Sequence, residues 1–291
     1  MSFTFDEVVS QPDVWCEALL RLESFSHRLP KHGERIAVVG CGTSFYVGQS
    51  YVRHREAAGL GPGDVFTPDE LPAARAYDRL VFITRSGTTS EVVRLVEHQK
   101  VAPSTVAITA VESSPAALAA DQRIVLDFAD ERSVVQTRFA TTVLALLRAH
   151  TGEDLGNVID EASKALAGPL PADLSSFERF VFLGRGWAAS VAHEAALKLR
   201  ESALAWSESY SDLEFRHGPI SVADAGTLVW ALGNVDGPTL AAIKATGATV
   251  IDARSDPLVE LVRIHRAALA LADARGLDID RPRHLSRSVV F

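Results

Sequence analysis

The stretch RIAVVGCGTS at residues 35–44 is an apolar, β-branched run that ends in Gly-x-Gly. The stretch FVFLGRG at residues 180–186 has the same pattern, 144 residues later when counted from Gly40 to Gly184. A segment long enough for a helix follows each stretch. Because glycines allow the backbone to turn sharply, both stretches predict a buried strand that passes directly into a helix.

Two further pairs of apolar runs repeat at nearly the same spacing. LVFIT at residues 80–84 corresponds to LVWAL at 228–232, and STVAIT at 104–109 corresponds to ATVIDA at 248–253. These runs do not alternate with polar residues, which is typical of strands buried on both faces of a parallel sheet. We predict strands at 35–39, 80–84, 105–109, 123–127, 179–183, 227–232 and 247–251. The predicted fold is α/β, with two tandem units that each contain a parallel sheet covered by helices on both faces.

The length of the chain agrees with this duplication. A chain of 291 residues is long enough for two domains, and 47% apolar residues suffice for two packed cores. The segment GPLPADLSS at residues 168–176 is the best candidate for a linker. We therefore expect a first unit at residues 1–168, which includes an N-terminal helix, and a second unit at residues 169–291.

Charge and hydropathy exclude several classes of partner. The chain has 29 Lys and Arg against 37 Asp and Glu, a net charge of −8, and so has no basic surface for nucleic acid. No apolar run approaches the roughly 20 residues that a membrane span needs, and the first residues lack the pattern of a signal peptide. Two cysteines cannot form a disulfide framework. We expect a cytoplasmic protein with neither a nucleic acid nor a membrane as partner.

Two polar loops follow predicted strands. The loop at residues 40–44 lacks the third glycine of a dinucleotide-binding fingerprint, because residue 45 is Phe45, and it lacks the lysine of a P-loop. The loop at residues 84–90 carries five hydroxyl side chains and Arg85. Hydroxyl, amide and guanidinium groups at the start of a helix suit a phosphate monoester. The alternative is an ordinary turn whose hydroxyls cap the following helix.

Two further features carry titratable groups. The spacing of Glu194, Lys198 and Glu201 puts all three on one face of a helix, where they form either a functional cluster or a solvated ion pair. His217 lies beside a Gly-Pro turn, as a catalytic or a structural histidine. The histidines and cysteines do not have metal-ligand spacing, and no G-x-S-x-G motif is present. We expect neither a metal nor a cofactor.

Five motifs occur in one order along essentially the whole chain: CGTS at 41–44, SGTT at 86–89, ALKLRE at 196–201, ExxHGP at 214–219 and DxDxPRxLxxSV at 278–289. Together they resemble the double-SIS family of sugar-phosphate isomerases and deaminases, which includes the isomerase half of glutamine–fructose-6-phosphate aminotransferase. The resemblance implies two SIS units of flavodoxin-like topology, in agreement with the internal repeat.

The resemblance also implies roles for particular residues. Glu201 corresponds to the base of the isomerisation, Lys198 to its lysine neighbour, and His217 to the ring-opening histidine, which in such a homodimer comes from the partner subunit. The phosphate and sugar contacts correspond to Thr43, Ser44, Thr84, Arg85, Ser86, Thr89, the backbone near Val134, and Ser286 and Arg287 in a tail that folds over the sugar.

Two positions depart from the family pattern. Arg85 stands in place of a glutamine, and Arg287 in place of a tail lysine associated with the sugar carbonyl. Since arginine stays protonated, Arg287 cannot supply a free amine, and Lys198 is the one candidate amine among these motifs. The two arginines could also accommodate a larger or more anionic substrate, such as a sugar–amino acid adduct. The nucleophilic cysteine and glutamine-hydrolysing domain of the synthase have no counterpart in this sequence, so we do not expect a complete glutamine-dependent synthase.

The function expected from these residues is aldose–ketose isomerisation of a hexose or amino-sugar 6-phosphate, with or without deamination. Glu201 would move a proton between C1 and C2. Two alternatives stay open, a deglycase that acts on sugar–amino acid 6-phosphates and a non-catalytic protein that senses sugar phosphates.

Overall fold

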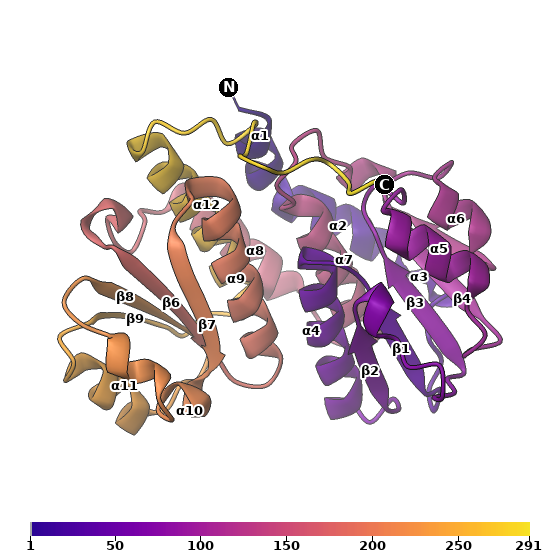
Figure 1. Ribbon diagram of the computed structural model, residues 1–291, viewed down its shortest axis with the longest axis horizontal. Coiled ribbons are helices and arrows are strands. Elements are labelled where there is room, and N and C mark those ends of the chain that lie inside the picture. The colour runs from indigo at the N-terminus through magenta and orange to yellow at the C-terminus, as the bar shows by residue number, and fades with distance from the viewer. Residues whose placement is uncertain (1) are drawn as a thin grey trace. The chain divides into compact units, whose positions relative to one another are not determined.

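The computed structural model of the protein describes residues 2–291, which fold into two compact units, each built on a parallel sheet (Figure 1). The five-strand unit comprises Ser10–Leu155 and Ser286–Phe291. The four-strand unit comprises the described residues up to Val9 together with Gly156–Leu285. Each unit is considered by itself.

The five-strand unit has the strand order β2-β1-β3-β4-β5, with every neighbouring pair parallel. Its strands are β1 (Ile36–Val39), β2 (Gly63–Phe66), β3 (Arg79–Ile83), β4 (Thr105–Thr109) and β5 (Gln122–Val125). Its helices are α2 (Gln11–Leu20), α3 (Leu22–Ser26), α4 (Thr43–Ala57), α5 (Ser90–His98), α6 (Pro115–Ala119) and α7 (Arg138–His150).

Helices cover both faces of this sheet. On one face Val39 and Phe82 belong to a buried cluster with Val92 and Val96 of α5. On the other face, Gly48 of α4 lies against Val38, the residue that precedes Val39 on β1, because a Cβ at Gly48 would come within 2.8 Å of the Val38 side chain. Since successive side chains of a strand point to opposite faces, α4 and α5 cover opposite faces of the sheet.

The four-strand unit has the order β7-β6-β8-β9, again parallel throughout. Its strands are β6 (Arg179–Gly184), β7 (Trp206–Ser211), β8 (Thr227–Leu232) and β9 (Thr249–Ala253). Its helices are α1 (Phe3–Val9), α8 (Gly156–Ala167), α9 (Trp187–Ala203), α10 (Asp212–Phe215), α11 (Gly237–Lys244) and α12 (Pro257–Ala274). Among residues 2–291, no helix combines the length and apolar character that a membrane crossing requires.

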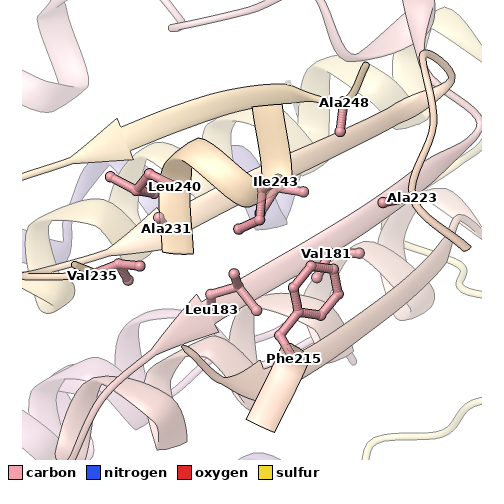
Figure 2. Packing of buried hydrophobic residues seen from close by; sticks show 10 residues of the cluster. Val181, Leu183, Phe215, Ala223, Ala231, Val235, Leu240, Ile243 and Ala248 are labelled. Atoms are coloured by element: carbon pink, nitrogen blue, oxygen red, sulfur yellow. The ribbon is translucent and has the colours of Figure 1, made fainter. Parts of the chain in front are cut away.

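The core of this unit also lies on both sides of its sheet. Figure 2 shows Leu183 and Val181 of β6 packed with Phe215 and with Leu240 and Ile243 of α11. Trp230 lies between Val229 and Ala231 on β8, so its side chain points to the other face of the sheet. There its Nε1 donates a hydrogen bond to Glu260 of α12 (3.1 Å). The predicted fold class, two parallel sheets with helices on both faces, is confirmed.

Each of the seven predicted strands is present within about two residues of its expected range. Strands β2 and β7, which lie at corresponding edges of the two sheets, are not among the predicted strands. Their sequences, GDVF and WSESYS, are short or polar, because an edge strand does not need a continuous apolar run. With them, the duplicated unit becomes strand, helix, edge strand: β1-α4-β2 in one unit and β6-α9-β7 in the other.

The two units have different bounds from those expected. Residues 156–168 were expected in the first unit, but α8 packs on α12 of the four-strand unit, where Arg266 donates hydrogen bonds to the carbonyl oxygens of Ala165 (2.6 Å) and Gly168 (2.8 Å). The start of the chain also belongs there, since Asp280 accepts hydrogen bonds from the backbone N–H groups of Phe3 and Thr4. The division is therefore interleaved along the sequence.

The Gly-x-Gly after the first strand of each unit has the same geometry twice. A Cβ at Gly40 would lie 2.7 Å from Ser44 Cβ, and a Cβ at Gly184 would lie 2.4 Å from the backbone of Ala188. The second glycines, Gly42 and Gly186, have φ of +53° and +59°. The first glycine thus permits close contact between strand and helix, and the second makes the turn.

We predict that Gly184→Ala lowers the free energy of unfolding of the four-strand unit by about 1–3 kcal/mol, because the added methyl group meets backbone atoms that cannot move aside. Urea unfolding followed by tryptophan fluorescence measures this, since Trp187, Trp206 and Trp230 lie in that unit. The control is Gly237→Ala in α11, where a Cβ meets nothing within 4 Å. Equal stability of the two variants would contradict the prediction.

Candidate functional site

The loop between β3 and α5, residues 84–90, is held in shape by its own side chains. Ser86 Oγ accepts a hydrogen bond from the backbone N–H of Thr88 (3.3 Å), and Gly87 has φ of +64°. The backbone N–H groups of Ser86, Gly87 and Thr89 have no hydrogen-bond partner among residues 2–291. N–H groups that are available directly before a helix can bind an anion.

The glycine of this loop cannot be replaced by a larger residue. Besides its positive φ, a Cβ at Gly87 would come 2.0 Å from Ser114 Oγ, which is itself buried. Thr84 and Ser86 are buried as well, at 5% and 8% exposure. The 84–90 loop is therefore packed against its surroundings rather than free to adapt.

The loop at residues 40–44 lies at the same end of the sheet, where the carboxyl ends of its strands meet, because β1 and β3 are parallel neighbours. Thr43 and Ser44, at the start of α4, are buried. Cys41 is an exposed residue, but partial desolvation of its thiol, together with the carboxylates of Glu91 and Asp69, raises the pKa of the thiol to about 11, so the thiol is protonated at neutral pH. Because both loops follow paired parallel strands, they lie at the same end of the sheet.

Arg85 has an environment different from the one expected of a phosphate ligand. Its side chain is almost completely buried and forms an ion pair with Glu131, whose carboxylate is also buried (3.3 Å). The guanidinium also donates hydrogen bonds to the carbonyl oxygens of Ser133 (2.9 Å), Val134 (3.3 Å) and Arg287 (3.2 Å). The backbone at Val134, expected to contact the sugar, thus accepts a hydrogen bond from Arg85.

The last six residues lie along the 84–90 loop in the five-strand unit (Figure 1). The carbonyl of Val289 accepts a hydrogen bond from the backbone N–H of Ser90 (3.1 Å), and one joins Thr88 Oγ1 to Ser288 Oγ (3.0 Å). Arg287 pairs with Asp130 (2.6 Å) and donates to the carbonyl of Glu131. Ser286 Oγ donates to the carbonyl of Ser288 within the tail (2.8 Å).

The remaining predicted residues lie in the four-strand unit. On α9, Lys198 Nζ is 3.3 Å from Glu194 Oε1 and 2.5 Å from Glu201 Oε2. Lys198 and Glu194 are buried, at 1% and 3% exposure, while the side chain of Glu201 is 20% exposed. A solvated surface pair does not describe this cluster. It is a buried charge cluster with one carboxylate that reaches solvent.

Electrostatics keep Lys198 charged. Burial lowers the pKa of Lys198, but the charges of Glu194 and Glu201 outweigh burial and raise it above its usual range. The side chain is therefore an ammonium group at neutral pH and does not provide the free amine considered from the sequence. Its position suits the stabilisation of negative charge.

His217 follows α10 and is exposed. Its backbone N–H donates to the carbonyl of Glu214 (2.9 Å), and Gly218 after it has φ of +130°. No hydrogen bond or ion pair joins its side chain to the described residues of its own chain. The structure thus brings together Lys198 and Glu201 but leaves His217 without a side-chain partner.

Sequence reasoning missed His265 on α12, which packs against α9. The imidazole is 2% exposed, and neither ring nitrogen has a hydrogen-bond partner among residues 2–291. Burial and the charge of Lys198 lower the pKa of His265 to about 3, so the ring is neutral at physiological pH. No sequence motif marks His265, because its burial beside Lys198 depends on the packing of α12 against α9.

Comparison with known proteins agrees with this geometry. Residues 31–150 match the SIS domain family, which covers the five parallel strands and the 84–90 loop. The chain is 27% identical to the isomerizing glutamine–fructose-6-phosphate aminotransferase of Bacillus licheniformis, over 88% of this chain and 51% of that protein. The chain spans about half the length of the curated relatives it matches.

Solved structures extend the likeness to both units. Glucosamine-6-phosphate deaminase from Thermotoga maritima is 26% identical and superposes with a TM-score of 0.80 over 100% of both chains. Tagatose-6-phosphate ketose/aldose isomerase from Escherichia coli shares the fold at 20% identity, with a TM-score of 0.78 over 100% of this chain and 96% of that one. The likeness to these solved structures therefore extends over both units and not over residues 31–150 alone.

The buried His265 predicts a pH dependence of stability. Because its pKa is lower in the folded protein than in the unfolded chain, the unfolded chain binds an extra proton below about pH 6.5. Stability therefore falls as the pH falls from 6.5 toward 3, by about 1.4 kcal/mol per unit from this group. We expect His265→Leu to remove this part of the acid destabilisation. Chemical denaturation at pH 7.5 and pH 5 measures the difference from the unsubstituted protein.

The matched control is His32→Leu, at an exposed histidine. It is expected to keep the pH dependence of the unsubstituted protein. If His265→Leu and the unsubstituted protein lost stability equally between these two pH values, His265 would not be a neutral buried histidine.

Proposed function

We propose that this protein is an enzyme that converts a hexose or amino-sugar 6-phosphate between its aldose and ketose forms. The observation that carries the proposal is the buried Glu194–Lys198–Glu201 cluster, in which one carboxylate, Glu201, reaches solvent beside a buried ammonium group. Support also comes from likeness over the whole chain to a glucosamine-6-phosphate deaminase.

The 84–90 loop is the proposed phosphate site. The backbone N–H groups of Ser86, Gly87 and Thr89 are available, and hydroxyl groups of Thr84, Ser86 and Thr89 stand beside them. Charge-assisted hydrogen bonds from such donors at a helix start bind a phosphate dianion. Thr43 and Ser44, which lie at the same carboxyl end of the sheet, are the proposed contacts to sugar hydroxyls.

Glu201 is the proposed base. With the sugar ring open, its carboxylate removes the proton from C2 and returns it to C1, while the hydroxyl proton of O2 passes to O1, which turns an aldose into a ketose through an enediolate. The ammonium of Lys198, 2.5 Å from the carboxylate, stabilises negative charge as it moves to the substrate oxygen. If C2 carries an amino group, the same transfer leaves an imine at C2, and water hydrolyses it to ketose and ammonia.

A homodimer is part of the proposal. His217 is exposed and has no side-chain partner in its own chain, among the residues described. Leu213 and Val222 near it in the chain are exposed apolar side chains, at 47% and 55%. A second copy of the chain that covers this surface would take His217 into its own site, as the family resemblance implies, where the imidazole can transfer the proton that opens the sugar ring.

We predict that Glu201→Gln lowers turnover by about 10²–10⁴-fold with little change in substrate binding, because the amide keeps the shape but cannot accept a proton. NMR of deuterium uptake at C1 or C2 from D₂O, across a panel of sugar 6-phosphates, detects the proton transfer even without net conversion. Glu161→Gln, at an exposed position of α8, is the control.

Each result of this exchange assay decides between hypotheses. Undiminished exchange in Glu201→Gln would show that Glu201 is not the base. Binding of sugar phosphates to the unsubstituted protein without any exchange would indicate a sensor rather than an enzyme. Release of an amino acid from a sugar–amino acid 6-phosphate would indicate a deglycase.

For the homodimer, we predict partial recovery of activity when inactive His217→Ala and inactive Glu201→Gln proteins exchange subunits. A mixed dimer would contain one site with both residues intact. Sedimentation measures the oligomeric state in parallel. A protein that is monomeric and active at the same concentration would rule out a shared site.

A further inference from the structure

The hydrogen bonds of Arg85 account for every N–H group at the end of its side chain. Each terminal nitrogen of a guanidinium carries two hydrogens. Nη1 donates to Glu131 and to the carbonyl of Ser133, while Nη2 donates to the carbonyls of Val134 and Arg287. The Nε–H group is buried and has no partner in the described chain. No terminal N–H of Arg85 is left to bind a phosphate.

The carboxylate that receives Arg85 is itself fixed. Glu131 Oε1 accepts hydrogen bonds from the backbone N–H groups of Thr137 (2.6 Å) and Arg138 (2.8 Å) at the start of α7. Glu131 Oε2 pairs with Arg85. Because both charges are buried, each requires the other. Arg85 is therefore held at one end by α7 and at the other by the end of β3.

The carboxyl-terminal tail, residues 286–291, is bound to the same group of residues from two sides. On one side the Arg287 carbonyl accepts from Arg85, and the Arg287 guanidinium pairs with Asp130. On the other side, Ser288 and Val289 bind Thr88 and Ser90 of the 84–90 loop, and the N–H of Phe291 donates to Ser90 Oγ (3.1 Å). The tail thus bridges Arg85 and the start of α5.

We propose that Arg85 is a positioning residue that couples the tail to the 84–90 loop, and that it is not a phosphate ligand. Through the carbonyl of Arg287 it keeps the tail docked before any ligand binds. The docked tail in turn orients Thr88 and Ser90, and so prepares the available N–H groups of the loop for an anion. The effect on phosphate rests on the proposed function of the loop, whereas the docking of the tail does not.

Arginine is required in this role because of its shape rather than its charge. Lysine keeps the positive charge but has three N–H donors at one point, so it cannot reach Glu131 and three carbonyl groups at once. A phosphate ligand that acts by charge would tolerate lysine. The Arg85→Lys variant therefore separates the two roles without leaving Glu131 unpaired.

The first experiment follows hydrogen exchange of the tail amides in the full chain without ligand. We expect Arg85→Lys to accelerate exchange at the amides of Phe291 and Ser90, whose hydrogen bonds join the tail to the loop, by about tenfold or more, because a docking interaction is lost. Asp130→Asn, which weakens the other attachment of the tail without touching Arg85, is expected to do the same. Unchanged tail exchange in Arg85→Lys would overturn the proposal.

The second experiment is a double-mutant cycle on the affinity for inorganic phosphate. We expect Arg85→Lys and Asp130→Asn each to weaken binding by about fivefold, and the double variant to be no weaker than either one, because both act through one docked tail. Additive losses would show that Arg85 acts on phosphate independently of the tail, which contradicts the proposal. Thermal unfolding of each variant identifies any loss of folded protein.

Ser86→Ala keeps the two hypotheses apart. It removes a proposed phosphate contact and the acceptor of the Thr88 N–H, and it is expected to weaken phosphate binding while the tail keeps its bonds to Arg85 and Asp130. If Ser86→Ala has no effect on phosphate but Arg85→Lys still releases the tail, the phosphate site of the proposed function is wrong and the positioning role of Arg85 stands.

Discussion

The contact between the end of the first strand and the start of the next helix is the constraint on which both units depend. At Gly40 and at Gly184 the helix backbone comes so close that a single methyl group would collide with it. This closeness lets α4 and α9 lie directly on their sheets. It also fixes the distance between the start of each helix and the end of the strand before it. Helix α9 is the helix that carries Lys198 and Glu201. A looser turn would shift both residues relative to the strand ends.

Buried charge is treated differently in the two units. In the five-strand unit, the side chains of Arg85 and Glu131 are both buried and paired with each other, and Glu131 also accepts hydrogen bonds from the backbone at the start of α7. In the four-strand unit, the Lys198 ammonium lies between the carboxylates of Glu194 and Glu201, and the Glu201 side chain is partly open to solvent. The neutral ring of His265 adds no second positive charge beside Lys198. One cluster serves as an anchor, and the other is suited to proton transfer.

The sequence predicted the parts of the structure that depend on local pattern. Buried parallel strands have continuous apolar runs, and the repeat of those runs showed the duplication. The edge strands β2 and β7 have one paired side and a polar sequence, so no such run marked them. The helical spacing of Glu194, Lys198 and Glu201 was visible, but their burial depends on how α12 packs over α9, which no local pattern contains.

Residues whose partners are distant in sequence were harder to interpret. Arg85 was predicted to bind phosphate because the neighbouring hydroxyl groups of its loop suit a phosphate. In the structure its side chain binds Glu131, 46 residues away, and the carbonyl of Arg287, 202 residues away. Glu131 and His265 were not noticed, since neither belongs to a motif. The expected boundary near residue 168 followed composition, whereas the compact units follow the packing of α8 on α12.

The interleaved division of the chain has a consequence for its synthesis. Helix α1 is synthesised long before α12, on which it packs. Residues 10–155 emerge as an almost complete unit, and the six residues that bind its 84–90 loop follow only after the whole of 156–285. At the usual pace of translation that interval is on the order of ten seconds. During it residues 10–155 contain all five strands of the sheet but not the tail, so the hydrogen bonds between the tail and the 84–90 loop are the last of this unit to form.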